Sequence, residues 1–332
     1  MNDQKLTDDQ STYPWMAHVH NWTKHSKAYK NTALSVSGWV KDEAGRMEDN
    51  NISKTDVPIN SGAQERAKLI AGSTSFDVYG RLLFDFHGIK QYIPNNVSLY
   101  VRLIPVPPAK ALISYTTTPC KLKIMQAKLY IGKVQLSQQA NGYYSTLLKR
   151  SGFEYPCQKY MLRTKLLQKG EQNIDWSPYL NCHPRQLYFW QTTLNAYNGD
   201  FKVNPFNFQQ FGLRKLQVYV NDVSLPSNVP MYLDENAKSV YAGTIAAINN
   251  PDAWDTTLEE FQNGYFLTVI DLTKDHSADS TYDSTNDFAT LRILADYHKP
   301  LTTSVAVYCM IEYDSCLSIN DGGDCRWKGR NN

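Results

Sequence analysis

The sequence lacks the patterns by which membrane proteins, secreted proteins and nucleotide-binding enzymes are commonly recognised. No run of about 18 apolar residues occurs, so the sequence predicts no membrane-spanning helix. Residues 1–10 are polar and acidic, without the basic and apolar regions of a signal peptide, so we expect none. The GxGxxG and Walker A patterns are also absent, and the sequence predicts no nucleotide site of either kind.

The spacing of the cysteines does not suit a metal. None of the six Cys residues belongs to a CxxC pair, and no His stands at zinc-knuckle spacing from them. We therefore expect no zinc site. We also expect reduced cysteines, in a protein that is made inside a cell and is not secreted.

A large excess of either charge is missing too. The chain has 34 Lys and Arg against 32 Asp and Glu, and this net charge of +2 gives no overall attraction to nucleic acid or to an anionic membrane. Arg326, Lys328 and Arg330 make the C-terminus basic, and such a tail either contacts nucleic acid or is solvated and mobile. We expect no partner with a specific nucleic-acid sequence.

Three histidines near the N-terminus form the first of three groups that resemble a site. On a helix, His18 and His20 would lie on different faces, and His25 would lie about two turns from His18. This spacing favours packed or exposed histidines over a metal site.

The other two groups lie in one loop. Asp275, His276 and Ser277 are the residue types of a catalytic triad, but adjacent residues rarely converge on one site, and no nucleophile elbow is present. Four acids could bind Ca²⁺ but lack the Asp-x-Asp-x-Asp-Gly order; they are Asp275, Asp279, Asp283 and Asp287. We interpret both groups as a solvated loop. The sequence predicts no catalytic, cofactor-binding or metal-binding residue, and therefore no enzyme.

Strand patterns dominate the chain, and helical patterns are few. Strands are marked by period-two alternation of Val, Ile, Tyr and Leu, and they end at Pro, Asn or Gly. The predicted strands are 98–104, 121–134, 213–220, 288–294 and 304–313, and the predicted helices are 14–29, 61–70 and 239–248. Many short strands with few helices favour a sandwich or barrel over units in which strands and helices alternate.

An internal repeat is the most informative feature of the sequence. The corresponding segments, in chain order, are 2–6 with 221–225, 80–86 with 265–272, 100–103 with 290–294, and 123–134 with 305–313. Four pairs in one order favour a duplication over chance. The second copy has further strands between Tyr160 and Phe208, before its first repeated segment. The first copy has no counterpart of these, so we expect the first β-domain to be incomplete at its N-terminus.

Several short motifs accompany the repeat. Asn198-Gly199 suits a turn with positive φ, and Phe206 and Phe208 place two rings on one face of a strand. The motifs as they stand are Asn195-Ala196-Tyr197-Asn198-Gly199, Asn204-Pro205-Phe206-Asn207-Phe208, Asn263-Gly264-Tyr265-Phe266 and Asp271-Leu272-Thr273, with weaker support from Tyr13-Pro14, Gly80-Arg81-Leu82, Val101-Arg102-Leu103, Tyr155-Pro156 and Glu312-Tyr313. None of these motifs contains a catalytic or ligand-binding pattern, and their residues are explained as core and turn residues.

In number and order, these motifs resemble the double jelly-roll major capsid proteins of Maverick/Polinton elements and adintovirus-like viruses, a lineage similar in architecture to adenovirus hexon. The resemblance runs from Asn2 to about Asn320. It implies an all-β fold of two tandem jelly-roll domains, the first of which departs from the family by lacking its N-terminal segment. We expect the first roll at residues 1–145 with a loop insertion at about 40–75, the second at 146–320, and a flexible tail at 321–332.

The resemblance also implies a function in a virion or virus-like transposon particle. Three chains with two rolls each would form a pseudo-hexagonal capsomer, so the expected partners are further copies of the chain, neighbouring capsomers, and penton or minor capsid proteins. The alternatives are a decayed or domesticated capsid gene, and a jelly-roll protein that binds a ligand or glycan, because a fold does not fix a function. For a glycan, Trp39, Trp176 or Trp254 would supply the stacking surface.

Overall fold

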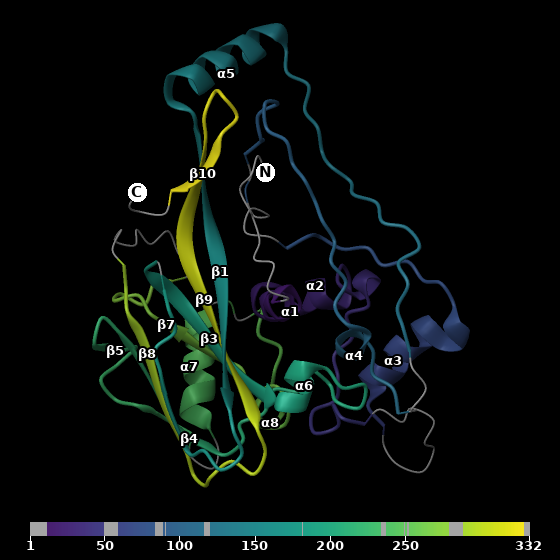
Figure 1. The fold of residues 1–332 in the computed structure, drawn as a ribbon, viewed down its shortest axis with the longest axis vertical. Helices are drawn as coiled ribbons and strands as arrows, with labels where there is room; N and C mark the ends of the chain where they lie inside the picture. Colours follow the sequence, from purple (N-terminus) through teal and green to yellow (C-terminus); the bar gives the residue numbers. More distant parts are fainter. Residues whose placement is uncertain are drawn as a thin grey trace.

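The computed structural model describes residues 12–49, 59–83, 89, 91–115, 120–180, 182–233, 237–248, 250, 252–278 and 288–328. It contains two antiparallel sheets, which lie together at the left of Figure 1. The strands are β1 (Phe153–Leu167), β2 (Asn173–Trp176), β3 (Pro184–Thr193), β4 (Leu213–Val220), β5 (Val223–Leu225), β6 (Met231–Tyr232), β7 (Thr268–Asp271), β8 (Leu291–Tyr297), β9 (Val305–Ile319) and β10 (Cys325–Lys328). The helices are α1 (Tyr13–Lys24), α2 (Lys27–Asn31), η1 (Ser35–Ser37), α3 (Ser61–Ile70), η2 (Ala71–Ser73), α4 (Pro108–Ala111), α5 (Gln138–Ser151), α6 (Leu194–Asn198), α7 (Lys238–Ile248) and α8 (Leu258–Gln262).

The strands between residues 153 and 319 have the connectivity of a jelly roll. Sheet 1 has the order β1-β9-β3-β7, and sheet 2 has the order β2-β8-β4-β5, with β10 added to β9 and β6 added to β4. Consecutive strands from β1 to β4 therefore alternate between the two sheets, and so do β7, β8 and β9. Two four-stranded sheets wound in this way are a jelly roll. The predicted all-β fold class is confirmed.

The ladders of this roll join early strands to late strands. None of β1–β4 pairs with another of these four, and each pairs with β5, β6, β8, β7 or β9. The longest ladder runs from Phe153 opposite Ile319 to Leu167 opposite Val305. The late strands taken alone would keep only the short contact of β10 with β9. Neither half of the roll can therefore form its sheets without the other half.

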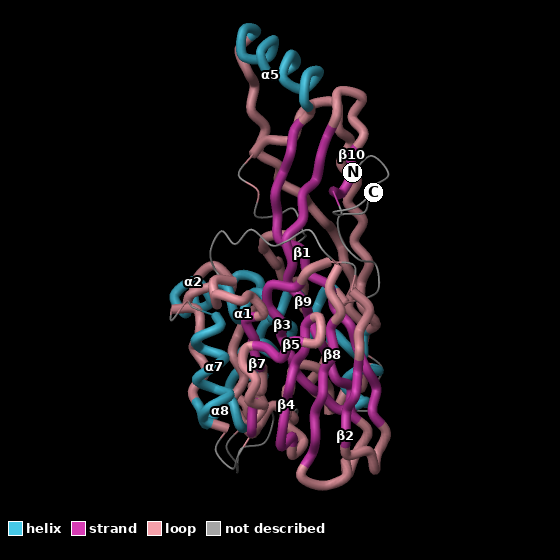
Figure 2. The backbone as a smooth tube through the Cα atoms, turned by 90° about the vertical axis from the view of Figure 1, so that its left-hand side faces the viewer, coloured by secondary structure: helices cyan, strands magenta, loops and turns pink. Residues whose placement is uncertain are grey.

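The burial of the strands shows three layers. β3 is buried at successive residues from Pro184 to Thr192, and β9 is buried from Val305 to Glu312, so both faces of these central strands are covered. β4 and β8 alternate between buried and more exposed residues, as strands with one face in solvent do. Figure 2 shows α1, α2, α7 and α8 together on one side of the molecule. Sheet 1 thus lies between these helices and sheet 2.

The predicted elements agree best with the structure where the chain is packed. β4 and α3 have the predicted bounds, and the predicted strands 288–294 and 304–313 fall largely within β8 and β9. The predicted helix 14–29 is divided into α1 and α2 at Ser26, whose side chain caps α2. Among the residues that the structure describes, no helix has the length and apolar character needed to cross a membrane.

Two predicted strands have no ladder. Residues 98–104 and 121–134 form no strand, and no described residue before Phe153 does. In the sequence repeat they correspond to β8 and β9, which pair with β1–β4. The described part of the first copy holds no equivalent of β1–β4, so among the described residues these segments have no strand to pair with. The repeat segment 80–86 is described only to Leu83, without strand structure, and the repeat segment 2–6 lies outside the described residues.

The predicted domain ends differ from the elements found there. α5 spans the predicted junction at residue 145. It begins after Ser137, whose side chain caps the N-terminus, and it ends at Gly152, which has φ of 68°. β10 lies within the segment 321–332 that the sequence predicts as a flexible tail, and this tail stays a prediction. The chain turns back at 320–324, where Asn320 donates to the Asp324 side chain, and β10 then pairs with β9. The division into two jelly-roll domains stays a prediction.

Two glycines allow a matched test of how α3 is held. A Cβ at Gly62 would lie 2.3 Å from the Lys41 carbonyl oxygen, whereas a Cβ at Gly142 in α5 would meet no atom within 4 Å. We expect Gly62→Ala to lower the free energy of unfolding by ~1–3 kcal/mol through overpacking. Gly142→Ala should raise it by ~0.5–1 kcal/mol, because alanine is the better residue inside a helix. Urea unfolding of both variants measures this, and a loss of stability in both would contradict the packing described.

Candidate functional site at the junction of the N-terminal segment and sheet 1

The most elaborate polar and aromatic structure in the molecule lies where residues 13–48, here called the clamp, pack against the jelly roll. α1 begins with Pro14 in its first turn, where a missing N–H is tolerated. Trp15, Val19 and Trp22 are buried, and their spacing places them on one helix face. This face joins the single large core cluster that also contains β3, β7 and β9.

Aromatic contacts fix the position of α1. The ring of Trp15 lies 5.0 Å from Tyr308 of β9 and 5.3 Å from Phe206, measured between centroids. Trp22 stacks on Trp254 at 5.4 Å, and its indole N–H donates to Thr256 Oγ1 at 3.0 Å. Aromatic pairs contribute about 0.5–1.5 kcal/mol each beyond the area they bury. The clamp is therefore held by specific contacts and not only by general burial.

Three lysines of the clamp bind acids of the jelly roll. Lys24 Nζ lies 3.0 Å from Glu312 Oε2, and the Glu312 side chain is 0% exposed. The same carboxylate accepts a hydrogen bond from Tyr188 Oη at 2.9 Å. Burial, with the Glu312 charge as the next cause, raises the pKa of Tyr188 well above its ordinary value. This hydroxyl therefore remains protonated and keeps donating to Glu312.

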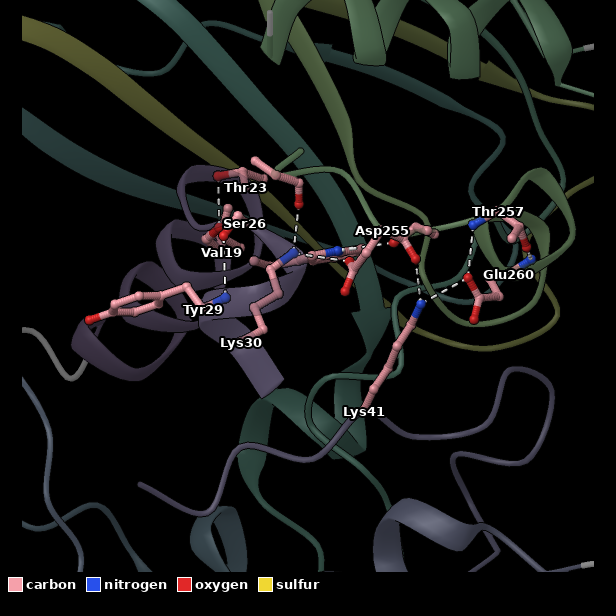
Figure 3. A network of polar contacts seen from close by, with 12 residues as sticks. Val19, Thr23, Ser26, Tyr29, Lys30, Lys41, Asp255, Thr257 and Glu260 are labelled. Atoms are coloured by element: carbon pink, nitrogen blue, oxygen red, sulfur yellow. Dashed lines mark hydrogen bonds and ion pairs between the residues drawn. The ribbon is translucent and has the colours of Figure 1, made fainter. Parts of the chain in front are cut away.

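The other two lysines meet at Asp255 (Figure 3). Lys30 Nζ donates to Ala253 O at 2.6 Å and to Asp255 Oδ1 at 3.0 Å, and its side chain is 1% exposed. Lys41 Nζ donates to Asp255 O at 2.8 Å and to Glu260 Oε2 at 2.9 Å. Burial lowers the pKa of Lys30, and the Asp255 carboxylate opposes this shift. The network satisfies a charge that would otherwise be costly to bury.

The end of the clamp is held by backbone and amide groups. Tyr265 Oη donates to Asp42 O at 2.7 Å, and burial raises the pKa of Tyr265 above its ordinary value. Asn204 N donates to Glu48 Oε2 at 3.0 Å, and Asn207 Nδ2 donates to Glu48 Oε1 at 2.6 Å. Two of the sequence motifs, 204–208 and 263–266, thus contact the clamp directly.

The three histidines of the N-terminal region contact different rings. His18 stacks on Phe206 at 4.0 Å and on Trp39 at 5.0 Å between ring centroids, while His20 lies 5.7 Å from His25. Burial first, and then the charges of Arg66 and Lys30, lower the pKa of His18 to about 3. In the part of the chain that is described, no group of three or more His, Cys, Asp or Glu side chains is placed to hold a metal ion.

The other predicted groups do not form a site in the described residues. A hydrogen bond from the Ser277 side chain lowers the pKa of Asp275, so these two residues interact within their own loop. Asp279, Asp283 and Asp287 lie outside the described residues, as does Arg330. Arg326 lies in β10 and is exposed. The absence of catalytic, cofactor and metal residues stays a prediction.

The three tryptophans considered for glycan stacking are engaged by the protein. Trp254 is 9% exposed and covered by Trp22, and Trp39 stacks with His18. Trp176 is partly buried against the core cluster. An exposed tryptophan platform for a sugar ring is therefore not present at these positions.

Sequence patterns did not indicate the charged network. Lys30 and Asp255 are separated by 225 residues, and no local spacing relates them. One signal was available at Thr257 and Glu260, whose reciprocal hydrogen bonds form a capping box at the start of α8. That signature predicts the start of a helix, but it does not predict that Glu260 also binds Lys41.

Comparison with known proteins gives distant similarities. No family model matches the chain. An uncharacterised protein of Caenorhabditis elegans is 22% identical over 248 residues, which are 73% of this chain and 55% of that protein. The chain thus spans about half the length of the curated relative that it matches.

Solved structures with partial similarity come from viruses. The match to the Sputnik virophage structure covers 53% of this chain and 39% of the virophage chain, with 14% identity and a TM-score of 0.37. The mavirus major capsid protein matches 53% of this chain and 41% of its own, with 8% identity and a TM-score of 0.32. The PBCV-1 virus capsid matches 58% of this chain and 54% of its own, with 11% identity and a TM-score of 0.35.

Proposed function

We propose that this chain is a structural component of a viral or virus-like shell, a major capsid protein of the double jelly-roll type. The observation that carries the proposal is the complete jelly roll of residues 153–319, together with the repeat of its late-strand pattern in residues 80–134. The sequence motifs that resemble Polinton and adintovirus capsid proteins support it. The chain then acts by packing and pairing, and not by catalysis.

The exposed apolar residues of the first copy support the proposal that it forms the first roll. The side chains of Tyr100, Leu103 and Ile104 are 81%, 56% and 61% exposed, and those of Met125 and Tyr130 are each 72% exposed. Exposed apolar residues that recur along two segments in this way suit a surface that a partner strand covers. In the assembled particle, 98–104 and 121–134 form ladders with strands equivalent to β1–β4. This pairing covers the apolar side chains and completes the first roll.

The geometry of two rolls per chain explains the proposed capsomer. Three chains with two rolls each present six similar bodies around a threefold axis, so a trimer can occupy a hexagonal lattice position. Its partners are two further copies of the chain, neighbouring capsomers, and penton or minor capsid proteins. Such permanent interfaces bury roughly 2,000 Å² or more and are rich in apolar residues.

The proposal is tested by hydrogen exchange and by assembly. In the chain alone, amides of 98–104 and 121–134 should exchange at least about a thousandfold faster than those of β3 and β9, because they have no ladder. Co-expression with a polypeptide that supplies four first-half strands should protect them and give a trimer in light scattering. Protection of these segments in the monomeric chain alone, or a monomer after completion of the roll, would overturn the proposal.

A further inference from the structure

A cavity of about 350 Å³ lies where the clamp meets two loops of the jelly roll. One wall comes from Gly45, Met47 and Glu48, the second from Asn207 and residues 209–211, and the third from residues 262–264. Its volume is within the range of small-molecule sites, near the lower end. Neither the capsid proposal nor the sequence motifs assign it a role.

Hydrogen bonds hold the three walls together. Gly45 N donates to Asn263 O at 2.7 Å, and Phe208 N donates to Gly264 O at 2.8 Å. Asn207 Nδ2 donates to Glu48 Oε1 at 2.6 Å across two of the walls. A site that is fixed before a ligand arrives loses little entropy on binding. The cavity is therefore preorganised by the docking of the clamp.

The lining has an unusual composition. Five of the lining residues have carboxamide side chains: Asn207, Gln209, Gln210, Gln262 and Asn263. Two of these amides already donate within the protein, Asn207 Nδ2 to Glu48 Oε1 and Asn263 Nδ2 to Glu259 O. None of the described residues that line it is Lys, Arg or His, and its one ionisable side chain is that of Glu48. Carboxamides both donate and accept hydrogen bonds. This lining suits a neutral ligand rich in hydroxyl groups, and it disfavours phosphates and other anions.

Two further observations concern Gln210 and Phe211. Gln210 Nε2 is buried and has no acceptor among the residues that the structure describes, so the side chain loses little by turning toward a ligand. Phe211 has φ of +52°, a left-handed conformation that is strained for a non-glycine residue. Such strain is concentrated at functional sites. Phe211 also gives the cavity an aromatic wall, against which the C–H face of a sugar ring can pack.

We propose that this cavity binds a neutral sugar of about the size of one or two hexose units. The carboxamides pair with the hydroxyl groups, and Phe211 packs against the ring. Glu48 accepts from hydroxyl groups and repels acidic sugars. The site is distinct from the three tryptophans, and it depends on the clamp for residues 45–48.

The test uses the full chain and sugars of known composition. Ligand-observed NMR and calorimetry are carried out with glucose, galactose, mannose and N-acetylglucosamine, and with glucuronate as the acidic comparison. At least one neutral sugar should bind, and glucuronate should bind more weakly than that sugar. Gln210→Ala should weaken binding roughly tenfold, the worth of one or two hydrogen bonds. Gln139→Ala, on the exposed surface of α5, should leave binding unchanged.

A second variant separates the charge from the fold. Glu48→Gln keeps side-chain oxygen and shape, and should remove the discrimination against glucuronate. Near-ultraviolet circular dichroism confirms that each variant is folded. The proposal is overturned if none of the four neutral sugars binds, or if a folded Gln210→Ala protein binds as tightly as the unchanged chain.

Discussion

Replacing Lys30 by Met should lower the free energy of unfolding by about 3–5 kcal/mol, because it leaves a nearly buried carboxylate without its partner. The Asp255 side chain is 10% exposed, and the Ala253 carbonyl would lose its charged donor as well. Methionine has a similar length and fills the space, so the loss reports the charge and not a cavity. Urea unfolding followed by tryptophan fluorescence measures it, since Trp22 and Trp254 stack at the same junction.

The control is an exposed lysine in another ion pair. Lys68 and Glu65 on α3 are 69% and 55% exposed, and Lys68→Met should change stability by no more than about 1 kcal/mol. The double variant Lys30→Met with Asp255→Asn removes the unpaired charge and should recover part of the loss. Equal effects of Lys30→Met and Lys68→Met would show that the clamp is not docked as described.

Acidification should weaken the clamp through His18. Its pKa is about 3 in the folded chain and 6.5 when solvated, because the ring is buried against Phe206 and Trp39, near Arg66 and Lys30. The folded chain therefore favours the neutral imidazole, and the unfolded chain takes up a proton more readily. Above pH 6.5 the protonation of His18 does not lower the free energy of unfolding. As the pH falls from 6.5 toward 3, this free energy decreases progressively. The loss by pH 4 is about 3 kcal/mol.

The variant His18→Phe isolates this contribution. Phenylalanine keeps an aromatic ring between Phe206 and Trp39 and cannot take up a proton. Carboxylates titrate in the same range in both proteins, so the difference between the two stability curves from pH 7 to pH 4 reports His18 alone. The unchanged chain should lose about 3 kcal/mol more than the variant over this range. Parallel curves would place His18 in solvent.

The strand patterns predicted the fold where each strand has a partner. β4 has one face in solvent, and its alternation appears directly in the sequence, so its bounds were predicted correctly. Residues 121–134 show the same alternation without a ladder, because periodicity describes the faces of a strand and not whether a neighbour exists. α5 was missed since Gly142 interrupts its pattern, although Ser137 and Gly152 mark its ends.

The candidate site was much less accessible from sequence. Motifs such as 204–208 and 263–266 were interpreted as turn and core residues, and their contacts with Glu48 and Asp42 depend on segments more than 150 residues away. A buried lysine such as Lys30 has no local signature, because its burial is decided by tertiary packing alone. Sequence patterns specify local structure well, and they specify pairs of distant charges poorly.

The pairing of early with late strands determines when the roll can fold during synthesis. β1 has no ladder until β9 follows, and their ends, Phe153 and Ile319, are far apart in the chain. At about 5–20 residues per second, a ribosome needs on the order of ten seconds to reach the partner strand. During that interval β1 has no strand to pair with, while β4 can pair only with β5 and β6, and β3 only with β7. Completion of both sheets of this roll therefore waits for the synthesis of β8 and β9.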